Sequence, residues 1–193
     1  MTRDTYLPHA FVCRLTLAAL GCALLITGVQ AQDEDPPTRA ARLAYLEGSV
    51  SFQPAGTTDW VAPPINRPMT TGDQLWVDQD GRAELQLDGS ALRVSAGTAL
   101  SFLNLADGVT QIQLSSGTLV VHVRRLDQGE IYEVDTPNLA FTAQAPGTYR
   151  LSVDPQGATT SVLVRRGQGG LRAIVSRSFR GIHFSEGGQS RDV

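Results

Sequence analysis

The sequence contains no lysine, and its only two cysteines are Cys13 and Cys22. The missing lysine excludes Schiff-base chemistry and the phosphate-binding lysine of P-loop proteins. Charged residues are 18% of the chain, aromatic residues are 6%, and the net charge is −3, so we expect no nucleic-acid partner. The 193 residues suffice for one domain with tails, and 41% hydrophobic content is too high for a disordered chain.

Residues 1–31 have the pattern of a secretory signal helix. Arg14 precedes an apolar run over residues 15–29, and Ala31 ends a cleavage site. The run is shorter than the ~20 residues that span a membrane, so we expect membrane contact only through this segment, if it is not cleaved. An acylated Cys22 is the alternative. Cleavage after Ala31 would remove both cysteines and exclude disulfides and zinc–thiolate sites.

The rest of the chain divides into three parts. Residues 32–41 form an acidic, proline-rich linker, and residues 171–193 are expected to be a poorly ordered or partly stranded tail. Residues 42–170 alternate apolar and polar residues between glycine turns that recur about every 8–12 residues. The alternation predicts a core that includes Leu85, Leu87, Ile112, Leu114, Leu119, Val121, Val123, Tyr149, Leu151, Val153, Val162 and Val164.

These patterns predict an all-β fold after the signal helix. The strands are short and close in sequence, which favours a sandwich, a barrel or a coil-like stack of strands. No segment after residue 31 sustains a helical stripe. Pro63, Pro64 and Pro68 exclude regular structure from the loop that contains them.

An ordered series of short motifs carries a family resemblance. The series is Gly48-Ser49-Val50, Trp60, Arg67–Trp76, the run Arg82–Arg93 with its Asp88-Gly89-Ser90 turn, Leu114–Leu119, Tyr132–Asn138 and Pro146–Arg150. It resembles the periplasmic domain of the ferric-citrate regulator (FecR) family, in particular its stand-alone exported members. The resemblance covers about residues 42–170.

The resemblance implies a twisted β-roll, or solenoid-like sandwich, in the periplasm of a Gram-negative bacterium. In the regulators this domain contacts an outer-membrane transporter, and a cytoplasmic segment inhibits a sigma factor. Only about a dozen residues precede the apolar run here, so we expect that this chain is not itself the sigma-factor inhibitor. The family motifs carry architecture and no known chemistry.

Candidate catalytic and metal-binding residues are few. His122 alternates with apolar neighbours and should point outward, and the chain has no Gly-x-Ser-x-Gly nucleophile turn. The segment Asp78–Gly81 lacks the remaining ligands of a calcium loop. Glu130, Glu133 and Asp135 are predicted to lie on one strand as a solvated face. We expect no enzyme activity, no metal and no cofactor.

Three residues are candidates for contact with a partner or glycan: Trp60, Arg124 and Arg125. Trp60 lies in a loop and should be exposed, whereas Trp76, between Leu75 and Val77, is expected to be packed. Arg124 and Arg125 follow a strand end, as Arg165 and Arg166 do. The two pairs would form a basic edge for an anionic glycan or membrane surface, or charged strand ends that deter edge pairing.

The sequence therefore predicts a non-enzymatic, exported binding or scaffolding module of the bacterial envelope. Its expected partner is an envelope protein, contacted in cell-surface signalling through an edge or face of the sheets. The alternative is a carbohydrate- or peptidoglycan-binding module, whose partner is cell-wall glycan. An exposed Trp60 beside polar groups would favour the alternative.

Overall fold

The computed structural model describes residues 39–174 and the strands at residues 182–186 and 189–192. These residues belong to a compact unit that spans Pro37–Val193. The predicted signal helix, its cleavage site, both cysteines and most of the linker lie outside the described residues. Within the described residues, no helix is long and apolar enough to cross a membrane.

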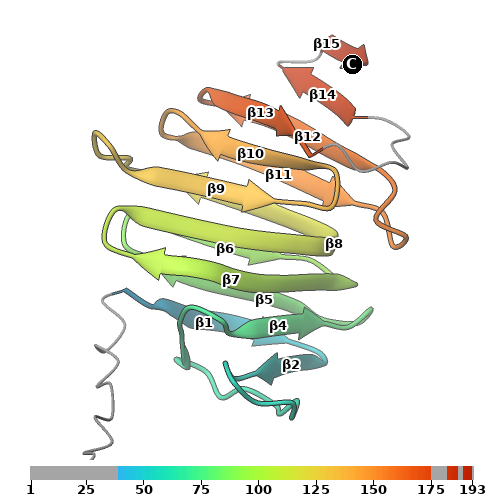
Figure 1. The fold of residues 1–193 in the computed structure, drawn as a ribbon. Helices are drawn as coiled ribbons and strands as arrows, with labels where there is room; N and C mark the ends of the chain where they lie inside the picture. Colours follow the sequence, from blue (N-terminus) through green and yellow to red (C-terminus); the bar gives the residue numbers. More distant parts are fainter. Residues whose placement is uncertain (1–38, 175–181, 187–188, 193) are drawn as a thin grey trace, which may run out of the picture. The chain divides into compact units, whose positions relative to one another are not determined.

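Within the described residues, fifteen strands form one curled sheet whose two halves make two layers (Figure 1). Sheet A contains, in spatial order, β3 (Pro68–Met69), β1 (Ala41–Glu47), β5 (Arg82–Leu87), β6 (Ser90–Val94), the second half of β8 (Val109–Val123), β11 (Gly147–Val153), β12 (Thr160–Arg166), β14 (Ile182–Glu186) and β15 (Gln189–Asp192). Sheet B contains β2 (Val50–Gln53), β4 (Gln74–Val77), β7 (Thr98–Ala106), the first half of β8, β9 (Ile131–Asp135), β10 (Leu139–Ala143) and β13 (Gly169–Ala173).

Most strand pairs are antiparallel, and the two parallel pairs are β8 with β9 and β12 with β14. The first follows from the course of the chain around the sandwich. β8 begins in sheet B and ends in sheet A, and the next strand returns to sheet B in the same direction. The structure thus confirms the predicted all-β class with strands stacked as a twisted, solenoid-like sandwich. β13, β14 and β15 lie at the start of, or within, the predicted tail.

The crossing of β8 between the layers takes place at Gly117. Ser116 pairs with Ala99 in sheet B, whereas Gly117 pairs with Val153 in sheet A. Gly117 has φ of 86°, a conformation that glycine adopts without steric cost. A Cβ atom there would lie 2.5 Å from the Thr98 Cα atom, so the crossing needs glycine for space as well.

The core lies between the two layers. Every residue of the core set predicted from the alternation is buried, and the cluster also includes Phe52, Phe102 and Phe141. The Tyr149 ring stacks at a tilt against Phe141 with their centroids 5.0 Å apart. The Tyr149 hydroxyl donates to the carbonyl oxygens of Ala145 and Gln168, which ties two connecting loops together. Period-two alternation therefore places this core correctly.

Candidate functional site

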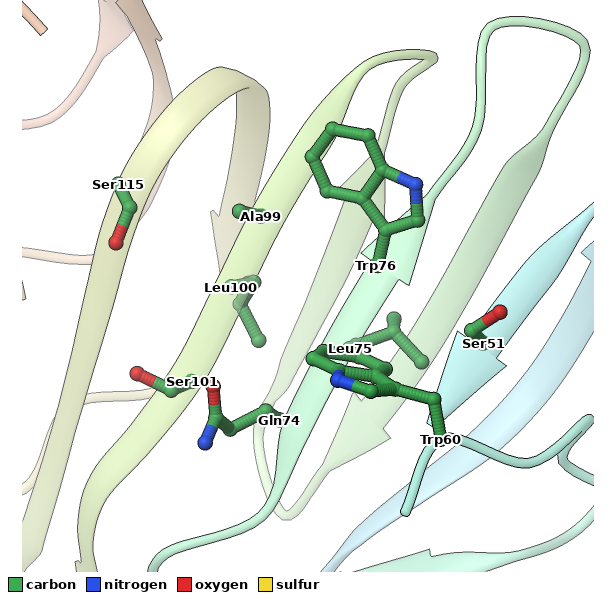
Figure 2. Close-up of a pocket in the computed structure, with 9 residues that line it drawn as sticks. All are labelled: Ser51, Trp60, Gln74, Leu75, Trp76, Ala99, Leu100, Ser101 and Ser115. Atoms are coloured by element: carbon green, nitrogen blue, oxygen red, sulfur yellow. The ribbon is translucent and has the colours of Figure 1, made fainter. Parts of the chain in front are cut away.

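A groove of about 360 Å³ lies on the outer face of sheet B. It is lined by Ser51, Trp60, Gln74, Leu75, Trp76, Ala99, Leu100, Ser101 and Ser115. Figure 2 shows the Trp60 indole extending across β4 toward Gln74 and Ser101, with the Trp76 indole beside it. Leu75 and Leu100 point into the core, so they contribute only backbone to the floor of the groove. The volume lies at the lower end of the range for small-molecule sites, ~300–1,000 Å³.

The loop that carries Trp60 lies along the edge of sheet B. Phe52 in β2 and Val61 exchange two backbone hydrogen bonds of 2.8 and 2.9 Å, so the loop continues the sheet beyond β2. The Arg67 guanidinium lies over the Phe52 ring, 4.6 Å from its centroid, which is a cation–π contact. The loop is therefore held against the sheet, and Trp60 is placed beside β4 by backbone pairing.

Asp73 anchors both ends of the same loop. Its carboxylate is buried, with 6% exposure, and accepts hydrogen bonds from the backbone N–H of Ala55 and of Thr70, each at 2.8 Å. Because a buried carboxylate needs such donors, Asp73 has a structural task at this position. The sequence identified it only as part of a turn and of an acidic stretch.

Trp76 does not pack in the core, contrary to the expectation from sequence. Leu75 and Val77 are fully buried, whereas Trp76 is half-buried on the outer face of the sheet. The reason is the period of the strand, since the residue between two inward-facing neighbours must point to the other side. Its cross-strand neighbours are Ser51 and Ala99. Both are small, and both also line the groove.

A second row of outward residues lies beside the tryptophans. Gln74 pairs across the strands with Gln53 on one side and with Ser101 on the other. The Ser101 hydroxyl lies 3.5 Å from the Gln113 side-chain oxygen, a long contact that leaves the hydroxyl available to a ligand. These amide and hydroxyl groups put neutral donors and acceptors next to two indole rings.

A polar pocket of about 390 Å³ lies at the end of the sandwich, among the turns after β5, β7 and β8. Arg39 forms an ion pair of 2.9 Å with Glu130, and both side chains are nearly buried. Arg39 also donates to Thr110 and to the Asp88 carbonyl oxygen. These bonds tie the start of the domain to the loop between β8 and β9.

The predicted contact residues Arg124 and Arg125 lie at this end. Both backbone N–H groups donate to the Gly89 carbonyl oxygen, at 2.7 and 3.3 Å, and both side chains are exposed. Arg125 lines the polar pocket and lies 3.5 Å from the Asp127 carboxylate. β8 and β12 pair with β11 on its two sides. Arg166 of β12 and Val123 of β8, which precedes Arg124, both lie beside the first residues of β11.

The structure therefore brings the two predicted arginine pairs to one end of sheet A, with carboxylates around Arg125. Trp60 is not part of that group. Trp60 and Arg125 line different pockets. The members of the groove that sequence reasoning missed are its serines and Gln74. The alternation around Leu75 could have indicated Gln74 and the outward turn of Trp76.

The other candidates for chemistry are occupied by structural contacts. His122 lies on the outer face of sheet A, as predicted, and its Nδ1 atom is 2.9 Å from the Thr148 hydroxyl. Asp80 accepts from the Ser49 backbone and hydroxyl. Among residues 39–174, no three His, Cys, Asp or Glu side chains are placed to hold a metal ion together.

Glu133 and Asp135 share the outer face of β9, as expected. The Gln111 amide donates to both carboxylates, at 3.1 and 2.9 Å, and Thr142 donates to Glu133. Burial raises the pKa of Asp135. Glu133 and Asp135 are thus part of a cross-strand hydrogen-bond network. The expectation that Glu130 lies on the same strand is wrong, because Glu130 lies in the loop before β9 and forms an ion pair with Arg39.

Comparison with protein-family models gives a match to FecR protein over residues 73–168. This chain contains a FecR domain. FecR domains are typically periplasmic modules of sigma-regulator signalling proteins, and they are generally non-catalytic. Comparisons with curated proteins and with solved structures gave no match.

The boundary of the match divides the groove. Gln74, Trp76, Ala99, Ser101 and Ser115 lie within the FecR domain as matched. Ser51 and Trp60 precede it, although their strand and loop pair with it in the same sheet. The groove is therefore completed by a segment of this chain that lies ahead of the matched FecR region.

Proposed function

We propose that this protein is a non-enzymatic, exported binding or scaffolding module of the bacterial envelope, and that it contacts another envelope protein in cell-surface signalling. The FecR domain supports the proposal, since such domains are usually periplasmic and serve in signalling proteins. Export itself rests on the signal-like pattern of residues 1–31.

The observation that carries the protein contact is the open edge of sheet B at β13. In the part of the chain that the structure describes, β13 pairs with β10 on one side only. Leu171 and Ile174 are 36% and 40% exposed there. An unpaired edge offers backbone donors and acceptors to an added strand, and exposed apolar side chains add burial when that strand arrives.

The opposite edge of sheet B is closed to such a contact. The loop residue Val61 already occupies the backbone groups of Phe52 in β2. An added strand would have to displace this loop, which Asp73 holds at both ends. Of the two edges of sheet B, β13 is therefore the one that we propose for recognition by strand addition.

Affinity capture tests this proposal. The full chain is tagged, produced with its own amino-terminal segment and crosslinked lightly in intact cells, and the recovered proteins are identified. A specific envelope protein should be recovered with the wild type and lost with Leu171→Arg, because a charge on an edge strand disfavours pairing. Ile131→Arg is the matched control, since Ile131 is 48% exposed on β9, an interior strand.

Two results would overturn the proposal. Recovery of the same protein with Leu171→Arg would remove β13 as the contact. Recovery of cell-wall fragments alone would replace the protein partner by a glycan. The exposure of Trp60, 46%, beside Gln74 and Ser101 favours this second candidate, a carbohydrate- or peptidoglycan-binding module.

A further inference from the structure

The two tryptophans of the chain line the same groove. Trp60 and Trp76 are the only tryptophans of the chain. Trp60 lies in a loop, Trp76 lies in β4, and the two are 16 positions apart in the sequence. Figure 2 shows the Trp60 indole extending across β4 and the Trp76 indole projecting from the same strand, and both line the groove. Large exposed aromatics are the main energetic contributors at binding sites, because they offer wide, rigid contact surfaces.

The Trp60 indole is exposed, and the Trp76 indole is half-buried with only small side chains directly across from it. Ser51 and Ala99 lie directly across from Trp76 on the two adjacent strands. Neither side chain is long enough to fold over an indole, whereas a long or branched one in these positions would pack on it. Trp60 remains 46% exposed. The aromatic surface is thus available from the solvent.

The lining of the groove contains no charged residue and combines aromatic surface with a few neutral polar side chains. Its polar side chains are Ser51, Gln74, Ser101 and Ser115. Hydroxyl and amide groups both donate and accept hydrogen bonds, and none of the nine lining residues is charged. The absence of a cation in this lining disfavours a phosphate or carboxylate ligand, and the serines disfavour an acyl chain.

We propose that this groove binds a glycan by stacking pyranose rings on Trp60 and Trp76. A pyranose has a flat face of C–H groups that packs on an indole, and its rim of hydroxyls both donates and accepts. The neutral side chains of Gln74 and the serines can donate to and accept from those sugar hydroxyls. The inference rests on the second candidate function, carbohydrate or peptidoglycan binding, and names the residues that would carry it. It does not rest on the protein contact at β13.

The site is preorganised. The Phe52–Val61 backbone pair and the Asp73 carboxylate fix the loop that carries Trp60. Trp76, Ala99 and Ser101 are fixed by the strand register. A site held in place before binding loses little conformational entropy when the ligand arrives, which favours measurable affinity even in a shallow groove.

Tryptophan fluorescence provides a direct test, because both tryptophans lie in the groove and the emission reports on nothing else in the chain. The full chain is titrated with two probes: soluble glycan strands released from peptidoglycan, and cellohexaose, a neutral glucose oligomer. We expect a saturable change in emission with at least one probe. The probe that saturates distinguishes wall glycan from a neutral polysaccharide.

Trp60→Ala should weaken binding about tenfold or more, with Trp76 retained as the reporter. Ile65→Ala is the matched control, since Ile65 is 47% exposed in the same loop and does not line the groove. It should leave affinity within about twofold. Ser101→Gln keeps both tryptophans and adds no charge, yet it fills the groove, and it should abolish binding.

The inference is overturned if neither probe changes the emission, or if Trp60→Ala binds as tightly as the wild type. It is also overturned if a protein captured from intact cells is lost with Trp60→Ala while neither glycan binds. Leu171→Arg should leave glycan affinity unchanged. The proposals for the glycan site and for the protein contact can therefore be overturned independently.

Discussion

The outer faces of the two sheets differ in how their polar side chains are used. On sheet A, Arg93 lies 3.0 Å from Glu84, and the His122–Thr148 and Thr118–Ser152 pairs are 2.9 and 3.0 Å apart. Around β4 on sheet B, two tryptophans lie beside serines and an alanine. A face whose side chains satisfy one another has little left for a ligand, whereas the face around β4 keeps both aromatic surface and free donors.

The difference also exists within sheet B. Gln111, Glu133 and Thr142 form a hydrogen-bonded network over β8, β9 and β10, as the pairs of sheet A do. The groove is confined to β2, β4, β7, the Ser115 region of β8 and the loop that carries Trp60. It follows that binding capacity here is a property of a few cross-strand neighbours and not of the sheet as a whole.

The largest expected effect comes from Gly117→Val, which would disturb both faces at once. Gly117 has a positive φ, and a Cβ atom there would meet Thr98 and Gly97. We expect the free energy of unfolding to fall by about 3 kcal/mol or more, measured by urea denaturation. Gly108→Ala is the control, because nothing lies within 4 Å of its Cβ position, and about 1 kcal/mol is expected. Equal losses would contradict this account of the crossing.

The next largest effect should be confined to the groove. Asp73→Ala leaves the backbone N–H groups of Ala55 and Thr70 without their acceptor, which should lower the free energy of unfolding by about 2–3 kcal/mol. The released loop should also shift tryptophan emission to the red. Asp80→Ala, an exposed carboxylate near Ser49, should cost less than about 1 kcal/mol and leave emission unchanged. An unshifted emission in the Asp73 variant would show that Asp73 does not hold Trp60 in place.

A smaller effect is expected from the ion pair on sheet A. Arg93 is 67% exposed and Glu84 is 26% exposed, so solvent screens their attraction. A double-mutant cycle with Glu84→Gln and Arg93→Gln should give a coupling below about 1 kcal/mol. Neither variant should alter glycan affinity. A change in that affinity would mean that the two faces are coupled through the core.

The smallest effect concerns the pH dependence of stability. Burial raises the folded-state pKa of Asp135 above that of the unfolded chain, so stability falls as pH rises through the window between the two values. Asp135→Asn removes this dependence. Relative to the wild type, the melting temperature of the variant should therefore be higher at about pH 7 than at about pH 3.

Asp154→Asn is the control with the opposite sign. The Ala158 backbone N–H lowers the pKa of Asp154, so its contribution is present at neutral pH and is lost as pH falls through the folded-state pKa. This variant should be destabilised more at about pH 7 than at about pH 3. Parallel pH profiles for the two variants would contradict the assignment for Asp135.

Most of the fold could be predicted from the order of residues in the sequence. Alternation identified the core positions from Leu85 to Val164, and the ordered turn motifs indicated the family that the match over residues 73–168 supports. The exposed position of Trp60 was also expected. These features are local. In a strand every second side chain points to the same face, and glycine in a turn can adopt positive φ without steric cost.

The site could be predicted only in part. Trp60 was identified, but Trp76 was expected in the core, and nothing indicated that Ser101 lies beside Gln74. Cross-strand neighbours depend on register, and register depends on which strands pair and where bulges fall. The structural task of Asp73 could not be predicted from the sequence either. Its partners Ala55 and Thr70 lie on either side of a loop whose course the sequence does not determine.

The sequence by itself determined the all-β class, the inward face of most strands and the glycine turns, because each depends on residues adjacent in the chain. The tertiary structure alone decided that β8 serves both layers, that one edge of sheet B is closed by a loop and that two distant tryptophans share one groove. Those outcomes depend on contacts between strands far apart in the sequence, and strand pairing makes such contacts only when the whole sandwich forms.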